Sequence, residues 1–146
     1  MKGLIWIAAA VLVVAAGWQT ARADGGSIRV QVTGFRNGNG DLGCALFASA
    51  EHFPSGESLA RAKVAASKSG AECVFNGVLP GRYAVSVLHD ENRNGKMDLV
   101  PVIGMPLEGY GVSNNKTYAT HAPVFEECVF AFDGTGELLL AVTLRY

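Results

Sequence analysis

The sequence has 146 residues, and its 12 Lys and Arg side chains nearly balance its 13 Asp and Glu side chains, giving a formal net charge of −1 at pH 7. No basic stretch with interleaved aromatic residues is present, so nucleic acid is not an expected partner, and an anionic membrane surface gains little from this charge. Hydrophobic residues make up 49% of the chain, which is enough for a buried core.

The first 23 residues have the layout of a secretory signal peptide. Lys2 precedes an unbroken apolar stretch, and the small-x-small triplet Ala21–Ala23 closes the segment. The uncharged part, residues 3–18, is shorter than the roughly 20 residues of a membrane-spanning helix. We therefore expect residues 1–23 to be removed on export, with no membrane span left after cleavage; an uncleaved anchor is the alternative. Residues 24–146 are expected to form one domain in the periplasm or outside the cell.

Alternation of apolar and polar residues predicts the first two strands. Residues 27–35 alternate with the period of a half-buried strand. The Asn-Gly pairs in residues 36–41 predict a hairpin turn, so we expect an antiparallel second strand over residues 41–49. Pro and Gly interrupt residues 48–72, where a few Leu and Ala side chains have loosely helical spacing. A loop with at most a short helix is predicted there.

Two further hairpins are predicted in the rest of the chain. Residues 73–90 contain a Leu-Pro-Gly turn between two alternating stretches, and residues 124–146 form a hairpin around Asp-Gly-Thr-Gly. Between them, residues 99–123 are rich in Gly, Pro and polar side chains, which indicates a long surface excursion. Six or seven short strands with no convincing amphipathic helix predict an all-β fold, an antiparallel β-sandwich.

The loop after residue 89 has the pattern of a calcium-binding segment. Numbered from Asp90, it carries oxygen-bearing side chains at positions 1, 3, 5 and 9 and glycine at position 6, as in the first part of an EF-hand loop. Position 12, which is Glu in EF-hands, is Pro101, and only two of the side-chain ligands are charged, so binding would be weak. The alternative is a metal-free turn whose side chains bond to their own backbone. The predicted calcium ligands are Asp90, Asn92, Asn94, the backbone carbonyl of Lys96, and Asp98; Glu91 or Glu108 could complete the shell.

A polar stretch with two glycines follows this loop and is a candidate ligand-binding segment. Its candidate residues are Glu108, Tyr110, Ser113, Asn114 and Asn115. Tyr110 would offer a stacking face and the two Asn side chains would offer paired donors and acceptors, which suits a sugar or a peptide edge. The alternative is a long connection held by side-chain-to-backbone hydrogen bonds.

No nucleophile elbow or catalytic triad is recognisable, so a non-enzymatic module is predicted, with an envelope protein or a carbohydrate as its partner. The enzymatic alternative is a cell-envelope hydrolase of carbohydrates that uses Asp90 and Glu108 as a carboxylate pair. A metal-free structural accessory module is a further alternative. His89, at the end of a predicted strand, is expected to be a partly buried, hydrogen-bonded residue rather than a metal ligand.

The segments LPGRYAVSVLHDENRNGKMD and IGMPLEGYGVSNN resemble a bacterial family catalogued as domain of unknown function 2141. The resemblance also takes in the glycine-rich first turn and the final strand ending in Tyr, and so spans most of the mature chain. It implies a secreted or periplasmic protein with a transthyretin-like or immunoglobulin-like sandwich, and no known activity. The turn and the loop are also similar to the B-type repeats of bacterial surface adhesins, in which such loops bind calcium.

The three cysteines are Cys44, Cys73 and Cys128, and in an exported chain they predict one disulfide and one buried free thiol. A pairing of Cys44 with Cys73 is preferred because both lie on early strands that could be neighbours. The family pattern does not include these cysteines, so their connectivity stays open. No Cys-x-x-Cys is present, and neither a zinc site nor a redox motif is expected.

Overall fold

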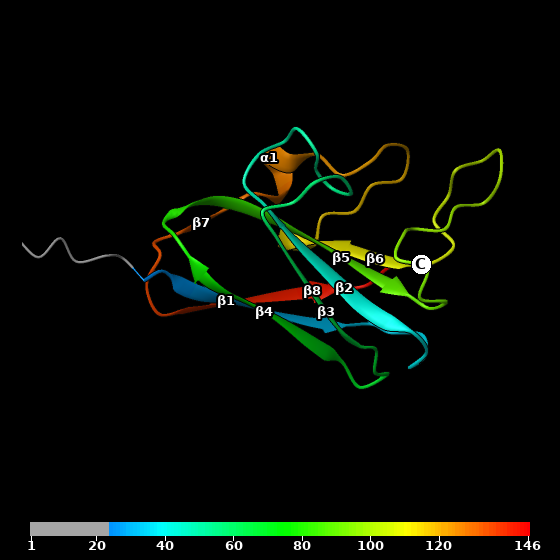
Figure 1. Cartoon of the computed structure of the whole chain (residues 1–146). Coiled ribbons are helices and arrows are strands. Elements are labelled where there is room, and N and C mark those ends of the chain that lie inside the picture. The colour runs from blue at the N-terminus through cyan, green and yellow to red at the C-terminus, as the bar shows by residue number, and fades with distance from the viewer. Residues whose placement is uncertain (1–23) are drawn as a thin grey trace, which may run out of the picture.

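The computed structural model describes residues 24–146, so the predicted signal peptide lies outside the described residues. Within that range, eight strands form two sheets that pack face to face, which confirms the predicted all-β sandwich and adds one strand to the expected number (Figure 1). None of the helices in residues 24–146 has the length and hydropathy that a membrane span requires.

The smaller sheet has the strand order β4-β1-β8. Its central strand β1 (Gly26–Thr33) pairs antiparallel with β4 (Ala71–Val78) and parallel with β8 (Glu137–Thr143). The parallel pair is a departure from the purely antiparallel sandwich that was predicted. It places the first strand of the described chain beside the last.

The larger sheet has the order β3-β2-β5-β6, with β7 paired to the start of β5. All of its pairs are antiparallel. Its strands are β3 (Ala60–Ala65), β2 (Asp41–Phe47), β5 (Gly81–Asp90), β6 (Gly109–Val112) and β7 (Phe130–Phe132).

Strand β3 lies where a loop with at most a short helix was predicted, and that prediction was wrong. The segment alternates as a strand does: Ala60, Ala62 and Val64 pack against the core, while Arg61 and Lys63 are exposed. Alanine is a strong helix former and is depleted in strands, so its presence at Ala60 and Ala62 hides the strand alternation in the sequence.

The three turns predicted to close hairpins instead carry the chain from one sheet to the other. Residues 34–40 join β1 to β2, residues 79–80 join β4 to β5, and residues 133–136 join β7 to β8. In each case the two joined strands lie in different sheets. Turn residues reverse the chain direction, whereas the partner of a strand is decided by which face buries apolar side chains. At the second turn, the Tyr83 hydroxyl donates a hydrogen bond of 2.8 Å to the carbonyl of Leu79 and fixes the change of sheet.

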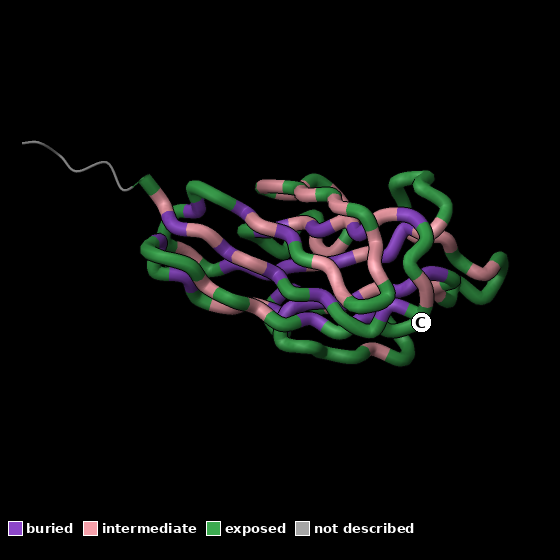
Figure 2. The backbone as a smooth tube through the Cα atoms, turned by 90° about the horizontal axis from the view of Figure 1, so that it is seen from below, coloured by how far each residue is buried: buried purple, intermediate pink, exposed green. Residues whose placement is uncertain are grey.

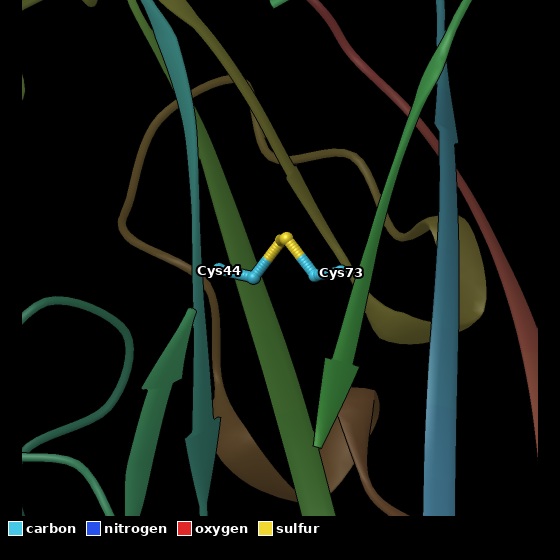
Figure 3. The surroundings of a disulfide bond; sticks show 2 residues. All are labelled: Cys44 and Cys73. Carbon is cyan, nitrogen blue, oxygen red and sulfur yellow. A yellow bond between two sulfur atoms is a disulfide. The ribbon is translucent and has the colours of Figure 1, made fainter. Parts of the chain in front are cut away.

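The main core fills the space between the two sheets, and buried positions alternate along the strands that face it (Figure 2). Cys44 on β2 and Cys73 on β4 cross this core as a disulfide with a Cα–Cα distance of 6.5 Å, which confirms the preferred pairing (Figure 3). Cys128 is a buried free thiol, also as predicted. Because β2 and β4 belong to different sheets, the disulfide is a covalent link between the layers.

A second, smaller core covers one end of the outer face of the larger sheet. It forms around α1 (Phe125–Cys128), close to the 3-10 turn η1 (Ser113–Asn115). The loops 48–59, 91–108 and 116–124 extend on this same side, away from the β4-β1-β8 sheet (Figure 1). The buried members of this core are Phe47, Ala84, Val112, Phe125 and Cys128.

Candidate functional site

The candidate calcium loop begins at the last residue of β5. Asp90 is buried, with 5% of its surface exposed, and its side chain turns back into the loop that it starts. One carboxylate oxygen accepts a hydrogen bond of 3.0 Å from the backbone N–H of Asn94, and the other accepts one of 2.7 Å from that of Gly95. Gly95 has φ +78°, which is the left-handed conformation that glycine adopts without steric cost. Asp90 therefore closes the sharp part of the loop.

The side chains of Asn92, Asn94 and Asp98 contact one another on the outside of the loop. The amide nitrogens of Asn92 and Asn94 donate to the two oxygens of Asp98, at 2.6 and 2.8 Å. Their amide oxygens accept the backbone N–H groups of Asn94 and Lys96 at 3.1 and 3.0 Å. The alternating positions of the sequence thus bring these three side chains together, with Asp90 beneath them.

The donor set of this loop fits calcium in kind, because a hard cation takes carboxylate, amide and carbonyl oxygens. Turning the amide oxygens of Asn92 and Asn94 toward an ion requires rotation of both amides, since their nitrogens now face Asp98. In the described part of the chain, no three His, Cys, Asp or Glu side chains gather where they could hold a metal. The loop has two carboxylates, and any ion there would depend on amide and backbone oxygens.

Glu108 fixes both ends of the loop from the chain segment that returns to β6. Its carboxylate is 4% exposed, and its two oxygens accept the backbone N–H groups of Glu91 at 2.9 Å and of Asp98 at 3.1 Å. The sequence suggested Glu108 as a ligand-binding residue, a shell-completing carboxylate or half of a catalytic pair. In the structure its oxygens, like those of Asp90, are engaged by backbone N–H donors.

Glu91 turns away from the loop toward the turn between β1 and β2. It forms an ion pair with Arg36 and accepts a hydrogen bond of 2.8 Å from the side chain of Asn37. Burial acts to raise the pKa of Glu91, but the hydrogen bonds from Asn37 and Arg36 and the positive charge of Arg36 outweigh it and leave the pKa lowered. Glu91 therefore anchors the start of the loop to the β1–β2 turn.

His89 precedes the loop and is fully buried, with both ring nitrogens hydrogen-bonded. Nε2 lies 2.7 Å from the carbonyl oxygen of Asn39, and Nδ1 lies 2.7 Å from the hydroxyl of Tyr146. A carbonyl only accepts, so Nε2 donates to Asn39, and in the neutral ring Nδ1 accepts from the Tyr146 hydroxyl. The sequence predicted a hydrogen-bonded His but gave no sign of Tyr146, which lies 57 residues away.

The rest of the candidate ligand segment is held by the protein's own backbone. The buried Ser113 hydroxyl lies 2.9 Å from the N–H of Val85 and 2.5 Å from the carbonyl of Cys128. Asn114 donates to two carbonyl groups beside α1, and Asn115 bonds to the backbone of β8 at both ends of its amide. Of the five predicted residues, Tyr110 is the one that lines an open groove.

The model of a bacterial family matches residues 30–138, which is most of the described chain. The family is described as an uncharacterized protein conserved in bacteria (DUF2141). The chain belongs to this family. The match covers the loop, the Glu108 segment and the six strands β2 to β7 in full; it begins halfway along β1 and ends at the start of β8. Comparison with curated proteins and comparison with solved structures each found no match.

Proposed function

We propose that this member of the DUF2141 family is an exported, non-enzymatic β-sandwich module whose Asp90–Asp98 loop binds calcium. The proposal is carried by the convergence of Asp90, Asn92, Asn94 and Asp98 in a loop whose ends Glu108 holds in place. Export is supported by the disulfide, since such bonds persist in oxidising compartments. An ion at this position would stiffen the end of the larger sheet.

The charge of the loop sets the expected affinity. Two carboxylates are fewer than tight calcium sites use, so the dissociation constant should be about 0.1–1 mM, the range of extracellular calcium modules. An ion that binds only the folded chain adds stability by mass action, about 2 kcal/mol when calcium is in roughly twentyfold excess over the dissociation constant. An envelope protein or a carbohydrate is the proposed partner of the stiffened end.

A metal-free structural module is the second candidate, and one observation favours it. The direct hydrogen bonds from Asn92 and Asn94 to Asp98 already close the loop without an ion. In that case the loop would act as a rigid turn, and calcium would add nothing to its stability.

Calorimetric titration of the mature protein with calcium chloride decides between the two. We expect heat of binding and a raised melting temperature for the native chain, and loss of both in Asp98→Ala. The matched control is Asp133→Ala, because Asp133 also accepts the hydrogen bonds of a tight turn but lies between β7 and β8. No heat at millimolar calcium, or an equal loss in both variants, would contradict the calcium proposal.

A further inference from the structure

A groove of about 880 Å³ lies over the part of the larger sheet that the second core leaves uncovered. Its floor is the outer face of β2, β5 and β6, where Gly43, Leu88 and Tyr110 stand side by side in register. One wall is the arm formed by residues 99–106, and another is formed by residues 118–123. This volume is within the range of small-molecule sites, about 300–1,000 Å³.

Gly43, on the floor of the groove, is not required there by a positive φ or by a close contact of the backbone. Gly43 lies in the middle of a central strand, and the nearest atom to a side chain built there is the Leu88 carbonyl oxygen at 3.9 Å, an ordinary contact. Glycine inside a strand weakens it, and it often marks a place where a ligand comes close to the backbone. Gly43, Ala45 and Ser86 carry short side chains or none, so this part of the groove floor is free of bulky side chains.

The arm presents apolar side chains to the groove and to solvent. Leu99, Ile103 and Met105 line the groove and are 50%, 69% and 60% exposed. The arm has defined backbone hydrogen bonds, including 2.8 Å from the N–H of Val100 to the carbonyl of Met105. A defined hairpin with this much exposed apolar surface indicates a binding surface rather than a core element.

The opposite edge of the groove is positively charged. Lys63 stands directly across from Gly43 on β3, and Arg61 lies two residues before it. Lys96 reaches the groove from the loop, and neither it nor Arg61 belongs to any ion pair in the part of the chain described. The acidic lining residue is Asp90, whose oxygens are bonded to backbone N–H groups.

We propose that this groove binds a single-chain amphiphile with an anionic head, specifically a long-chain carboxylate. The alkyl chain lies across Gly43, Leu88 and Tyr110 beneath the arm, and the carboxylate meets the cations of β3. The floor from β3 to β6 spans three strand spacings, about 14 Å, which suits an extended alkyl chain. Lys63 has a carboxylate partner, Asp41, at 4.0 Å, whereas Arg61 and Lys96 have none among residues 24–146. This excess of positive charge favours an anionic head over a neutral or cationic one. This binding does not depend on calcium.

The test is calorimetric titration of the mature protein with dodecanoate below its micelle concentration, in a chelator so that calcium plays no part. We expect saturable binding, and binding weaker by roughly tenfold or more for butanoate and for dodecyltrimethylammonium. Gly43→Val should block the floor and weaken dodecanoate binding by a similar factor while the far-ultraviolet circular dichroism stays native. Arg61→Ser with Lys63→Ser should weaken dodecanoate binding and should not weaken binding of the cationic amphiphile, whereas Lys68→Ser, outside the groove, should have no effect.

A second measurement covers the case in which Gly43→Val does not fold. Both tryptophans of the sequence, Trp6 and Trp18, precede residue 24, so Tyr110→Trp gives the mature chain a single tryptophan, on the groove floor, which can be excited selectively. Its emission should shift to shorter wavelength as dodecanoate is added. No binding of dodecanoate, equal binding of the cationic amphiphile, or native affinity in folded Gly43→Val would overturn the proposal. A groove that serves a protein partner instead would give the first of these results.

Discussion

The buried carboxylate of Glu108 accepts a hydrogen bond of 3.1 Å from the backbone N–H of Asp98. The same side chain bonds to the N–H of Glu91, so a single residue on the returning segment joins the beginning and the end of the candidate calcium loop. The loop is thus held by hydrogen bonds to a residue that lies outside it. The order of the loop should therefore depend on Glu108 as much as on its own Asp and Asn residues.

Replacement of Glu108 by Gln should lower the free energy of unfolding by about 1–3 kcal/mol, because the amide group turns one acceptor into a donor that faces a backbone N–H. Urea unfolding measures this change. Glu126→Gln is the matched control, since Glu126 forms an ion pair on the surface, is 66% exposed, and should change stability by less than about 1 kcal/mol. Equal effects of the two changes would mean that Glu108 does not hold the loop.

Loss of the disulfide should destabilise the sandwich more than any single hydrogen bond. Cys44 and Cys73 are 29 residues apart, and a cross-link of that length removes about 3–4 kcal/mol of chain entropy from the unfolded state. Guanidinium unfolding of the double variant Cys44→Ala, Cys73→Ala should show this loss. A reductant should lower the midpoint of the native chain and leave that of the variant unchanged. A native midpoint that is insensitive to reductant would contradict the cross-link.

Removal of the Tyr146 hydroxyl should cost about 1–3 kcal/mol, because it leaves Nδ1 of the buried His89 without its donor. The hydroxyl also accepts the backbone N–H of Arg36 at 3.1 Å, so the variant Tyr146→Phe loosens the β1–β2 turn as well. Denaturant titration is the measurement. In the control Tyr110→Phe, the lost hydroxyl contact is a long one of 3.5 Å, and little change is expected. A larger loss in the control would argue against the role of Tyr146.

Alkaline pH should weaken the fold. Burial raises the pKa of Tyr118 and of Tyr146 above the usual value of 10.0, and burial also raises the pKa of Cys128 above 9.0. Because the folded state disfavours the charged forms, stability is unchanged while these groups stay protonated in the unfolded chain, and it falls as pH rises through about 9 and above. Urea unfolding between about pH 8 and pH 11 should show the fall, with a shallower slope in Tyr118→Phe. A flat profile would contradict the raised pKa of these three groups.

The sequence predicted elements better than it predicted their partners. The alternation in β1, β2 and β5 gave the correct inward faces, because a period of two is a local property of the chain. The Asn-Gly, Pro-Gly and Asp-Gly turns were recognised as turns, but they join different sheets. Whether two successive strands pair depends on the packing of the whole sandwich, which no short window of sequence contains.

The candidate site shows the same division between local and distant contacts. The spacing of Asp90, Asn92, Asn94 and Asp98 placed four side chains in one loop, and they lie together in the structure. The contact of Tyr146 with His89 joins residues 57 apart, and nothing in either segment signals the other. The groove was also missed, because it arises from three separate loops above a face whose small residues look unremarkable in the sequence.

Because β1 pairs parallel with β8, the first strand of the described residues can complete its sheet only after the last one has formed. β1 is synthesised well before β8, yet one of its edges stays open until β8 has been made and has reached the same sheet. Closure over such a large sequence separation is slow. A chain cut short before β8 would present a bare strand edge to its neighbours, and such an edge is a template for aggregation.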